Sequence, residues 1–278
     1  MDAQGERLAP VPSGAGAVVL TGEGAAAPGL VAGRAAGAAA APECRPPSYD
    51  EWYVGLGASA QDSSAFELVN PDPGAAVVEI VLYGPSGEIE EPALRGIRVP
   101  GNEVKVLDLS EIAPRRVRLA AHLTVTRGRI SAAVRHTYDP LGLRVESAAP
   151  VVAGVEVLEG DLGRVGPVTA EEDTSVTVVP EGPKRLLLGA AIRPGVIRVT
   201  ATDADGKVLM DEERVEISSD RAASLALPDA AVAVTVEPRN TPIAGTVLLT
   251  GTARAPVFGQ VRLRPAEVYA QVPAVVPE

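Results

Sequence analysis

Aromatic residues, cysteine and histidine are scarce in this 278-residue chain. Aromatics make up 3% of the residues although 46% are hydrophobic, so the core must be built mainly from Val, Leu, Ile and Ala. The single cysteine, Cys44, excludes an intrachain disulfide, and we expect an unreactive thiol rather than a lipidated or intermolecular one. No stretch approaches the ~20 apolar residues that a transmembrane helix needs. The chain is rich in alternating runs of Val and holds 28 Gly and 25 Pro. This composition is typical of short strands and turns.

Basic clusters are also lacking. The net charge is −11, and the adjacent basic pairs are Arg115-Arg116 and Lys184-Arg185. Nucleic-acid binding requires clustered Lys and Arg that displace counterions from phosphates. We therefore expect no nucleic-acid partner.

The first 41 residues hold 14 Ala and 8 Gly. Their apolar run Ala17–Leu20 is shorter than the roughly 7–15 residues of a signal-peptide core. Two alternatives stay open: a disordered leader over residues 1–43, or a chain whose upstream export or membrane-anchoring segment is missing.

From residue 44 onward, alternating apolar residues and turn signals recur at the spacing of a sandwich of antiparallel strands. Arg127-Gly128 predicts a tight hairpin between the last two strands of the first half. The strands expected in that half are Trp52–Val54, Phe66–Val69, Val77–Tyr83, Ile97–Val99, Glu103–Leu109, Val117–Thr126 and Arg129–Thr137.

The strand pattern repeats. A shift of 119 residues aligns Phe66–Gly87 with Arg185–Gly206 without a gap, and weaker matches extend it towards the C-terminus. Ser175–Val179 is the expected equivalent of Trp52–Val54. We predict an all-β fold of two tandem antiparallel β-sandwich (immunoglobulin-like) domains, over residues 44–150 and 151–278, with edge strands at Val261–Leu263 and Val268–Val272.

The two histidines, His122 and His136, fall on the two strands of the predicted hairpin. Two imidazoles do not complete a zinc site, which takes four ligands, or three in a catalytic site. The second repeat has no histidine. We interpret both as structural and predict no metal and no cofactor.

Asp203-Ala204-Asp205-Gly206 resembles the start of a calcium loop, and Glu212 stands at the right distance for its end. Lys207 occupies a ligand position, however, so a hairpin turn is the favoured interpretation. No nucleophile elbow, zinc-protease motif or phosphate-binding loop occurs. We expect no catalytic residues and no enzyme.

The densest aromatic cluster is Tyr49, Trp52 and Tyr53. Exposed rings of this kind contact sugars or peptides, whereas a buried Trp52 plugs the end of a sandwich. These three residues are the candidate contacts for a ligand or partner.

The order of Cys44 with its prolines, Trp52–Gly57, Leu68–Pro71, Tyr83–Gly87 and Ala132–Val134 resembles an uncharacterised family of actinobacterial envelope proteins. The likeness extends over residues 44–263. It implies β-sandwich repeats in an exported or anchored protein, and it carries no enzymatic activity. The second repeat departs from the pattern, because Gly189-Ala190 replaces Asn70-Pro71.

We therefore expect a non-catalytic structural or interaction protein of the cell envelope or cell exterior, with a protein or cell-wall glycopolymer as partner. One alternative is a carbohydrate-contacting accessory subunit of an envelope hydrolase or transferase. Calcium-dependent adhesion through Asp203 and Asp205 ranks last. The oligomeric state and the partner's identity do not follow from the sequence.

Overall fold

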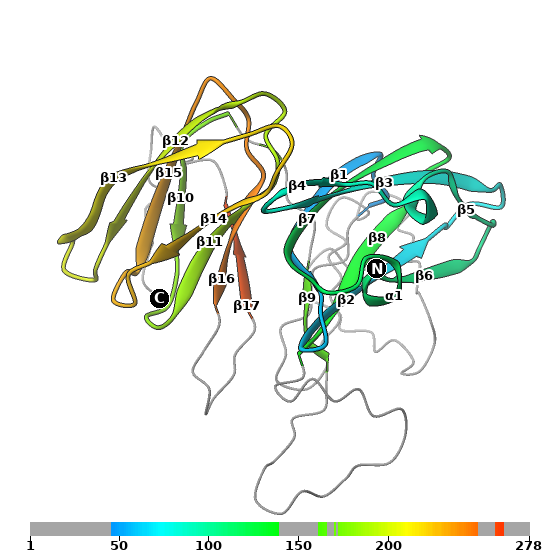
Figure 1. Cartoon of the computed structure of the whole chain (residues 1–278), viewed down its shortest axis with the longest axis horizontal. Coiled ribbons are helices and arrows are strands. Elements are labelled where there is room, and N and C mark those ends of the chain that lie inside the picture. The colour runs from blue at the N-terminus through cyan, green and yellow to red at the C-terminus, as the bar shows by residue number, and fades with distance from the viewer. Residues whose placement is uncertain (1–45, 139–160, 166–169, 171, 250–258, 264–278) are drawn as a thin grey trace, which may run out of the picture.

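The structure is a computed structural model in which antiparallel strands dominate (Figure 1). The predicted all-β class is confirmed. Cys44, the leader over 1–43 and the expected strand Val268–Val272 lie outside the described residues. Those residues are 46–138, 161–165, 170, 172–249 and 259–263.

Two groups of strands lie side by side in Figure 1, and we call them the first and second sheet groups. The first contains β1 Asp50–Ala58, β2 Asp62–Val69, β3 Ala76–Gly84, β4 Gly87–Ile89, β5 Ile97–Val99, β6 Val104–Asp108, β7 Arg116–Arg127, β8 Ser131–Tyr138 and β9 Asp161–Val165, with the short helices η2 Pro92–Leu94 and α1 Leu109–Ile112. The second contains β10 Ser175–Val178, β11 Lys184–Leu188, β12 Gly195–Thr202, β13 Val208–Ile217, β14 Ala223–Leu227, β15 Ala233–Arg239, β16 Gly245–Leu249 and β17 Gly259–Arg262.

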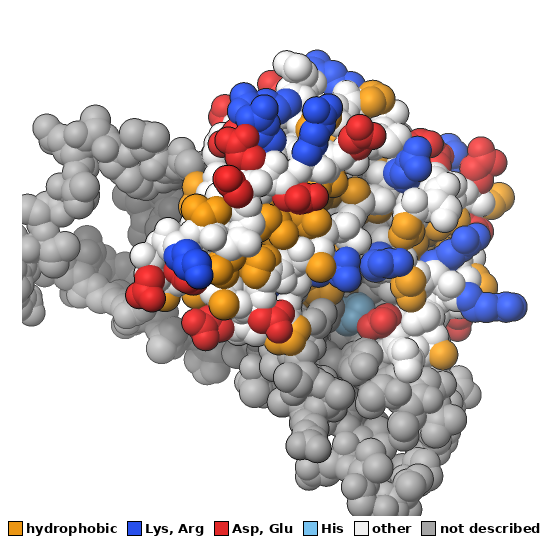
Figure 2. Space-filling model, turned by 60° about the vertical axis from the view of Figure 1, so that its left-hand side comes forward, with side chains coloured by type: hydrophobic (Ala, Val, Ile, Leu, Met, Phe, Trp, Pro, Cys, Tyr) orange, Lys and Arg blue, Asp and Glu red, His pale blue; other side chains and the backbone are white. Residues whose placement is uncertain are grey.

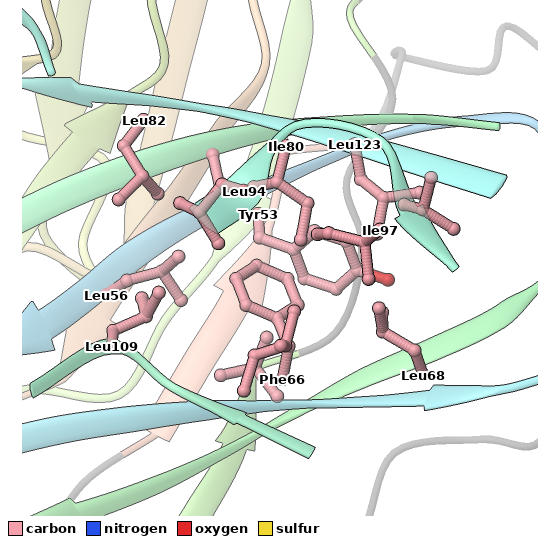
Figure 3. Packing of buried hydrophobic residues seen from close by; sticks show 14 of the residues in the cluster. Tyr53, Leu56, Phe66, Leu68, Ile80, Leu82, Leu94, Ile97, Leu109 and Leu123 are labelled. Carbon is pink, nitrogen blue, oxygen red and sulfur yellow. The ribbon is translucent and has the colours of Figure 1, made fainter. Parts of the chain in front are cut away.

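The first sheet group folds one sheet around a core. Its strands pair in the order β4-β3-β7-β1-β2-β8-β9, with β5 added to β3 and β6 to β2. A single residue pair, Ala58 with Ser63, joins β1 to β2, so the sheet bends there into two layers. Side chains that alternate along each strand meet between the layers, and Tyr53 packs edge-on against Phe66 at 5.2 Å (Figure 3).

The second sheet group consists of two separate four-stranded sheets, β10-β15-β12-β13 and β14-β11-β16-β17. They share one apolar core, to which Leu186 and Leu188 contribute from one sheet and Ile197 and Val199 from the other. With few aromatics in the chain, this core is built mainly from branched aliphatic side chains.

Both groups follow one pairing scheme. Strand β7 lies between β3 and β1 as β15 lies between β12 and β10, and β8 lies between β2 and β9 as β16 lies between β11 and β17. The shift of 119 holds in the register too. Leu68 faces Lys105 on β2 and β6, while Leu187 faces Ser224 on β11 and β14.

The predicted hairpin between the strands of His122 and His136 is wrong. Strand β7 pairs with β1 and β3, whereas β8 pairs with β2 and β9 in the other layer. The chain at Gly128, whose φ is 74°, therefore crosses between layers. A turn that joins two paired strands and a turn that crosses between layers have the same sequence signal. That signal specifies the local backbone and not the partner of the strand that follows.

The predicted boundary near residue 150 differs from the observed pairing. Strand β9 lies beyond that boundary, yet it pairs with β8 of the first sheet group, Val134 facing Val165. The first strand of the second group is β10. The expected edge strand at Val261–Leu263 corresponds to β17, which pairs with β16.

Candidate functional site

The structure does not bring Tyr49, Trp52 and Tyr53 onto one exposed surface. Tyr49 is 61% exposed, just ahead of β1. Neighbouring side chains on a strand point to opposite faces, so Tyr53 enters the first core while Trp52 points outward. The Tyr53 hydroxyl donates to Glu51 Oε2 at 2.6 Å or to the Ala132 carbonyl at 3.0 Å.

Trp52 is buried nevertheless, with 6% of its surface exposed, because the second sheet group covers it. Its ring stacks on the His122 ring at a centroid distance of 4.4 Å and an interplanar angle of 4°. Tyr83 lies on it as well, at 5.6 Å and 29°. Three ring systems from β1, β7 and β3 thus form the outer face that meets the second group.

The surface that receives Trp52 is made of one leucine and four small residues of the second group. We call it the seat, and it comprises Leu187, Gly189, Ala190, Ala222 and Ala244. A Cβ atom at Gly189 would lie 3.0 Å from Trp52 Cε3, which is closer than side-chain contacts normally are. The indole therefore fits because residue 189 has no side chain. The backbone N–H of Ala222 also donates to the Gly84 carbonyl at 3.0 Å, a hydrogen bond between the two groups. We call the contact of Trp52 with the seat, together with this bond, the joint.

Gly189-Ala190 is the place where the second repeat departs from the first. At the equivalent position, Asn70 is buried and ties loops of its own group together. The two hydrogens of its Nδ2 are shared among three carbonyls, while its Oδ1 accepts from the N–H of Asp72. The three acceptors are Gly74 at 2.7 Å, Val99 at 3.1 Å and Pro100 at 3.1 Å.

The same loop carries a two-bond ion pair. Both Asp72 carboxylate oxygens accept from Arg129, one from Nε and one from Nη2, each at 2.8 Å. The hydrogen bonds from Arg129 and its charge hold the pKa of Asp72 below its ordinary value. In the first group this surface is thus occupied by side chains that bond to each other and to nearby loops. The equivalent surface of the second group contacts Trp52 instead.

The two histidines belong to different layers. His122 Nε2 lies 3.0 Å from Asp50 Oδ1 at the rim of the joint, where Asp50 is exposed. His136 is buried on β8, and its Nδ1 lies 3.1 Å from Ser64 Oγ. Neither ring approaches the other, so the two do not form a shared site.

His136, Ser64 and Asp62 are the residue types of a hydrolytic triad, and sequence reasoning did not single out the serine or this aspartate. His136 Nε2 lies 3.6 Å from Asp62 Oδ1. Ser64 is fully buried, however, and its Oγ accepts the Gly57 N–H at 3.1 Å. A serine held in this way offers no surface to a substrate, so the cluster links β1, β2 and β8.

The turn at Asp203 is a hairpin turn between β12 and β13, as its sequence predicts. The Asp203 carboxylate accepts the N–H groups of Asp205 and Lys207 at 3.0 and 2.9 Å. Both bonds go to Oδ1, as in an Asx turn. Within the described part of the chain, no three His, Cys, Asp or Glu residues gather as metal ligands would.

Lys184 on β11 is the buried cation of the second group. Its Nζ donates to the carbonyls of Asp229 at 2.7 Å, Ala231 at 2.8 Å and Pro228 at 3.3 Å. Burial lowers the pKa of Lys184, because the charged form loses its water. The ammonium fastens the loop that precedes β15.

Charged side chains of both signs intermingle on the face shown in Figure 2, around a band of hydrophobic side chains. The acidic excess is thus not gathered into one field on that face. None of the helices in the described ranges has the length and apolar character to span a membrane.

Comparison with known proteins gives a family but no activity. Among curated proteins, none matches the chain. The profile of a family of unknown function (DUF5719) matches residues 3–141, which is half of the 278 residues. This match includes all of β1 to β8. The chain belongs to this family of unknown function, DUF5719.

Proposed function

We propose that the chain is a non-catalytic structural or interaction protein of the cell envelope, which presents two tandem immunoglobulin-like β-sandwiches to a protein or glycopolymer partner. The shared pairing scheme of the two sheet groups supports the tandem arrangement. The location rests on the sequence resemblance.

One observation carries the proposal. Tryptophan is the residue best suited to hold a sugar or peptide. The single tryptophan of the chain is instead buried in the joint between the two groups. The buried indole and the backbone hydrogen bond from Ala222 to Gly84 fix the two groups relative to each other. A fixed pair of sandwiches acts as a spacer or a presenting surface, and its function then lies in its outer faces.

The same observation gives no support to the alternative of a carbohydrate-contacting accessory subunit. Trp52 and Tyr53 are both buried, so neither offers an open ring to a sugar. Tyr49 alone of the three is exposed, and one ring does not make a stacking platform.

The test is capture of a tagged full-length chain from cross-linked cells of its native host, with fractionation of the envelope. We expect the chain in the envelope fraction, with envelope proteins or glycopolymer attached. Gly189→Val serves as the matched variant, since it opens the joint and leaves the outer faces unchanged. Recovery of cytoplasmic enzymes alone would overturn the proposal.

A further inference from the structure

An exposed group of arginines stands at the start of β7. Arg115, Arg116 and Arg118 occupy three of four successive positions, and all three are exposed. We call them the arginine corner. Their guanidinium groups have no hydrogen bond or ion pair with any residue that the structure describes. In a chain with a net charge of −11, acidic partners are plentiful, so three unpaired arginines together are unexpected.

The backbone at two of these positions is left-handed. Arg115 has φ 63° and Arg118 has φ 56°, a region in which residues with a Cβ are strained and glycine is not. Arg118 sits in a bulge of β7, because two residues there, Val117 and Arg118, oppose the single residue Gly57 of β1. On the facing strand, the other bulge is built with Gly55, whose φ is 87°. A bulge of this kind re-aims a side chain.

A left-handed acidic residue in the second group offers a comparison. Glu212 lies in a bulge of β13 with φ 43°. Its carboxylate accepts from Arg198 Nη1 at 2.8 Å, so this left-handed position takes part in an exposed ion pair within the chain. Arg115 and Arg118 keep arginine under the same strain without any such partner in the described chain.

From these observations we propose that the arginine corner binds an anionic polysaccharide. The proposal rests on the proposed function, because it names the site and the chemistry of the glycopolymer partner. Arginine matches carboxylate and phosphate groups through paired N–H donors.

Three separate guanidinium groups favour a polymer over a single anion. Anionic groups repeated along a chain engage several arginines at once and gain avidity. A single-stranded nucleic acid would also need an aromatic stacking platform. The exposed Tyr49 lies at the other end of β7, where its carbonyl accepts from Val125.

The experiment measures binding of the full-length chain to alginate, which carries carboxylates, and to phosphomannan, which carries phosphates, by calorimetry at low and physiological ionic strength. The variant is Arg115→Asn with Arg118→Asn, because asparagine tolerates left-handed backbone. The control is Arg127→Asn with Arg98→Asn, which removes two exposed arginines elsewhere on the first group. Thermal unfolding checks that each variant folds.

The wild type is expected to bind at least one polymer, more weakly as salt rises. Affinity should fall on the order of tenfold in the corner variant and stay near wild type in the control. Equal losses in both variants, or no binding by the wild type to either polymer, would overturn the arginine corner as the site. That failure leaves the envelope capture untouched, since the capture registers any partner. Tighter binding of a single-stranded DNA oligomer than of either polysaccharide would overturn the polysaccharide assignment.

Discussion

The two sheet groups share one strand-pairing scheme but use their equivalent positions for opposite purposes. In the first group, the loops are fastened by the buried and partly buried bonds of Asn70 and by the exposed Asp72–Arg129 ion pair. In the second group, Gly189 and Ala190 stand at the Asn70-Pro71 position and receive Trp52. Strand β10 of the second group is the equivalent of β1, which supplies Trp52. Trp52 pairs with His122, and at the same place in the second group Val176 pairs with Thr235. Val176 is 46% exposed.

This difference shows how a repeated fold acquires a joint. Pairing and register are set by alternation along the strands, which both groups keep. Loop ends tolerate replacement, so a few residues there and one outward-facing strand position decide whether a group closes on itself or docks on its neighbour.

The largest effect is expected from Trp52→Ala. Loss of the buried indole should lower the free energy of unfolding by about 3 kcal/mol and separate the unfolding of the two groups into two transitions. Urea unfolding followed by circular dichroism measures both. Val176→Ala, at the equivalent strand position, is the control and should cost less than about 0.5 kcal/mol. Equal costs for the two variants would mean that the joint does not couple the groups.

Asn70→Ala should come next, at about 2 kcal/mol, because three carbonyls lose their buried donor together. The loss should fall on the transition of the first group. Asn70→Asp should cost at least as much, since it keeps the acceptor for Asp72 and turns an oxygen towards the same carbonyls. A milder effect of the aspartate than of the alanine would contradict the donor role of Asn70.

Acid should weaken the first group through Asp72. The folded-state pKa of Asp72 lies below its ordinary value of 3.8, so the unfolded chain takes up this proton first as the pH falls. The contribution is therefore present above pH 3.8 and is lost as the pH drops through the folded-state pKa. Urea unfolding between pH 5 and pH 2 should show this dependence in the wild type and its reduction in Arg129→Met. An unchanged acid profile in that variant would exclude the ion pair as its cause.

Alkali should have a smaller effect, of opposite sense, on the second group. The pKa of Lys184 is lowered from 10.5 in the folded state, so in the window below 10.5 the unfolded chain holds more protons than the folded chain. Stability from this group therefore rises with pH through that window. Lys184→Met should abolish the rise, as seen by urea unfolding at pH 8 to 10.5. The first group has Ala65 at the equivalent position and supplies the internal reference.

Much of the fold could be predicted from local pattern. The strand Ile97–Val99 was expected with its observed bounds, and the 119-residue shift carries β2 and β3 onto β11 and β12. Alternation and turn chemistry suffice for these features because they are local. The crossover between β7 and β8 and the pairing of β9 were missed, since a strand's partner depends on contacts distant in sequence.

The site was harder to predict for the same reason. The sequence marks Trp52 as one ring among three, but burial of its outward face requires a second group placed against it. The departure at Gly189-Ala190 was visible as a broken motif, and only the structure gives it a role. The left-handed φ of Arg115 and Arg118 had no sequence signal, because arginine, unlike glycine or asparagine, is not enriched at positive φ.

The joint between the groups is directional. An outer strand face of one copy meets a loop end of the next, so the two contacting surfaces are not equivalent, and such a contact repeated from copy to copy builds an open series rather than a closed, two-fold pair. In the first copy, Asn70 and Pro71 occupy the receiving surface. Where Trp52 meets a bare glycine in the second copy, the first copy presents the Asn70 side chain, so the two copies differ in what this surface can receive.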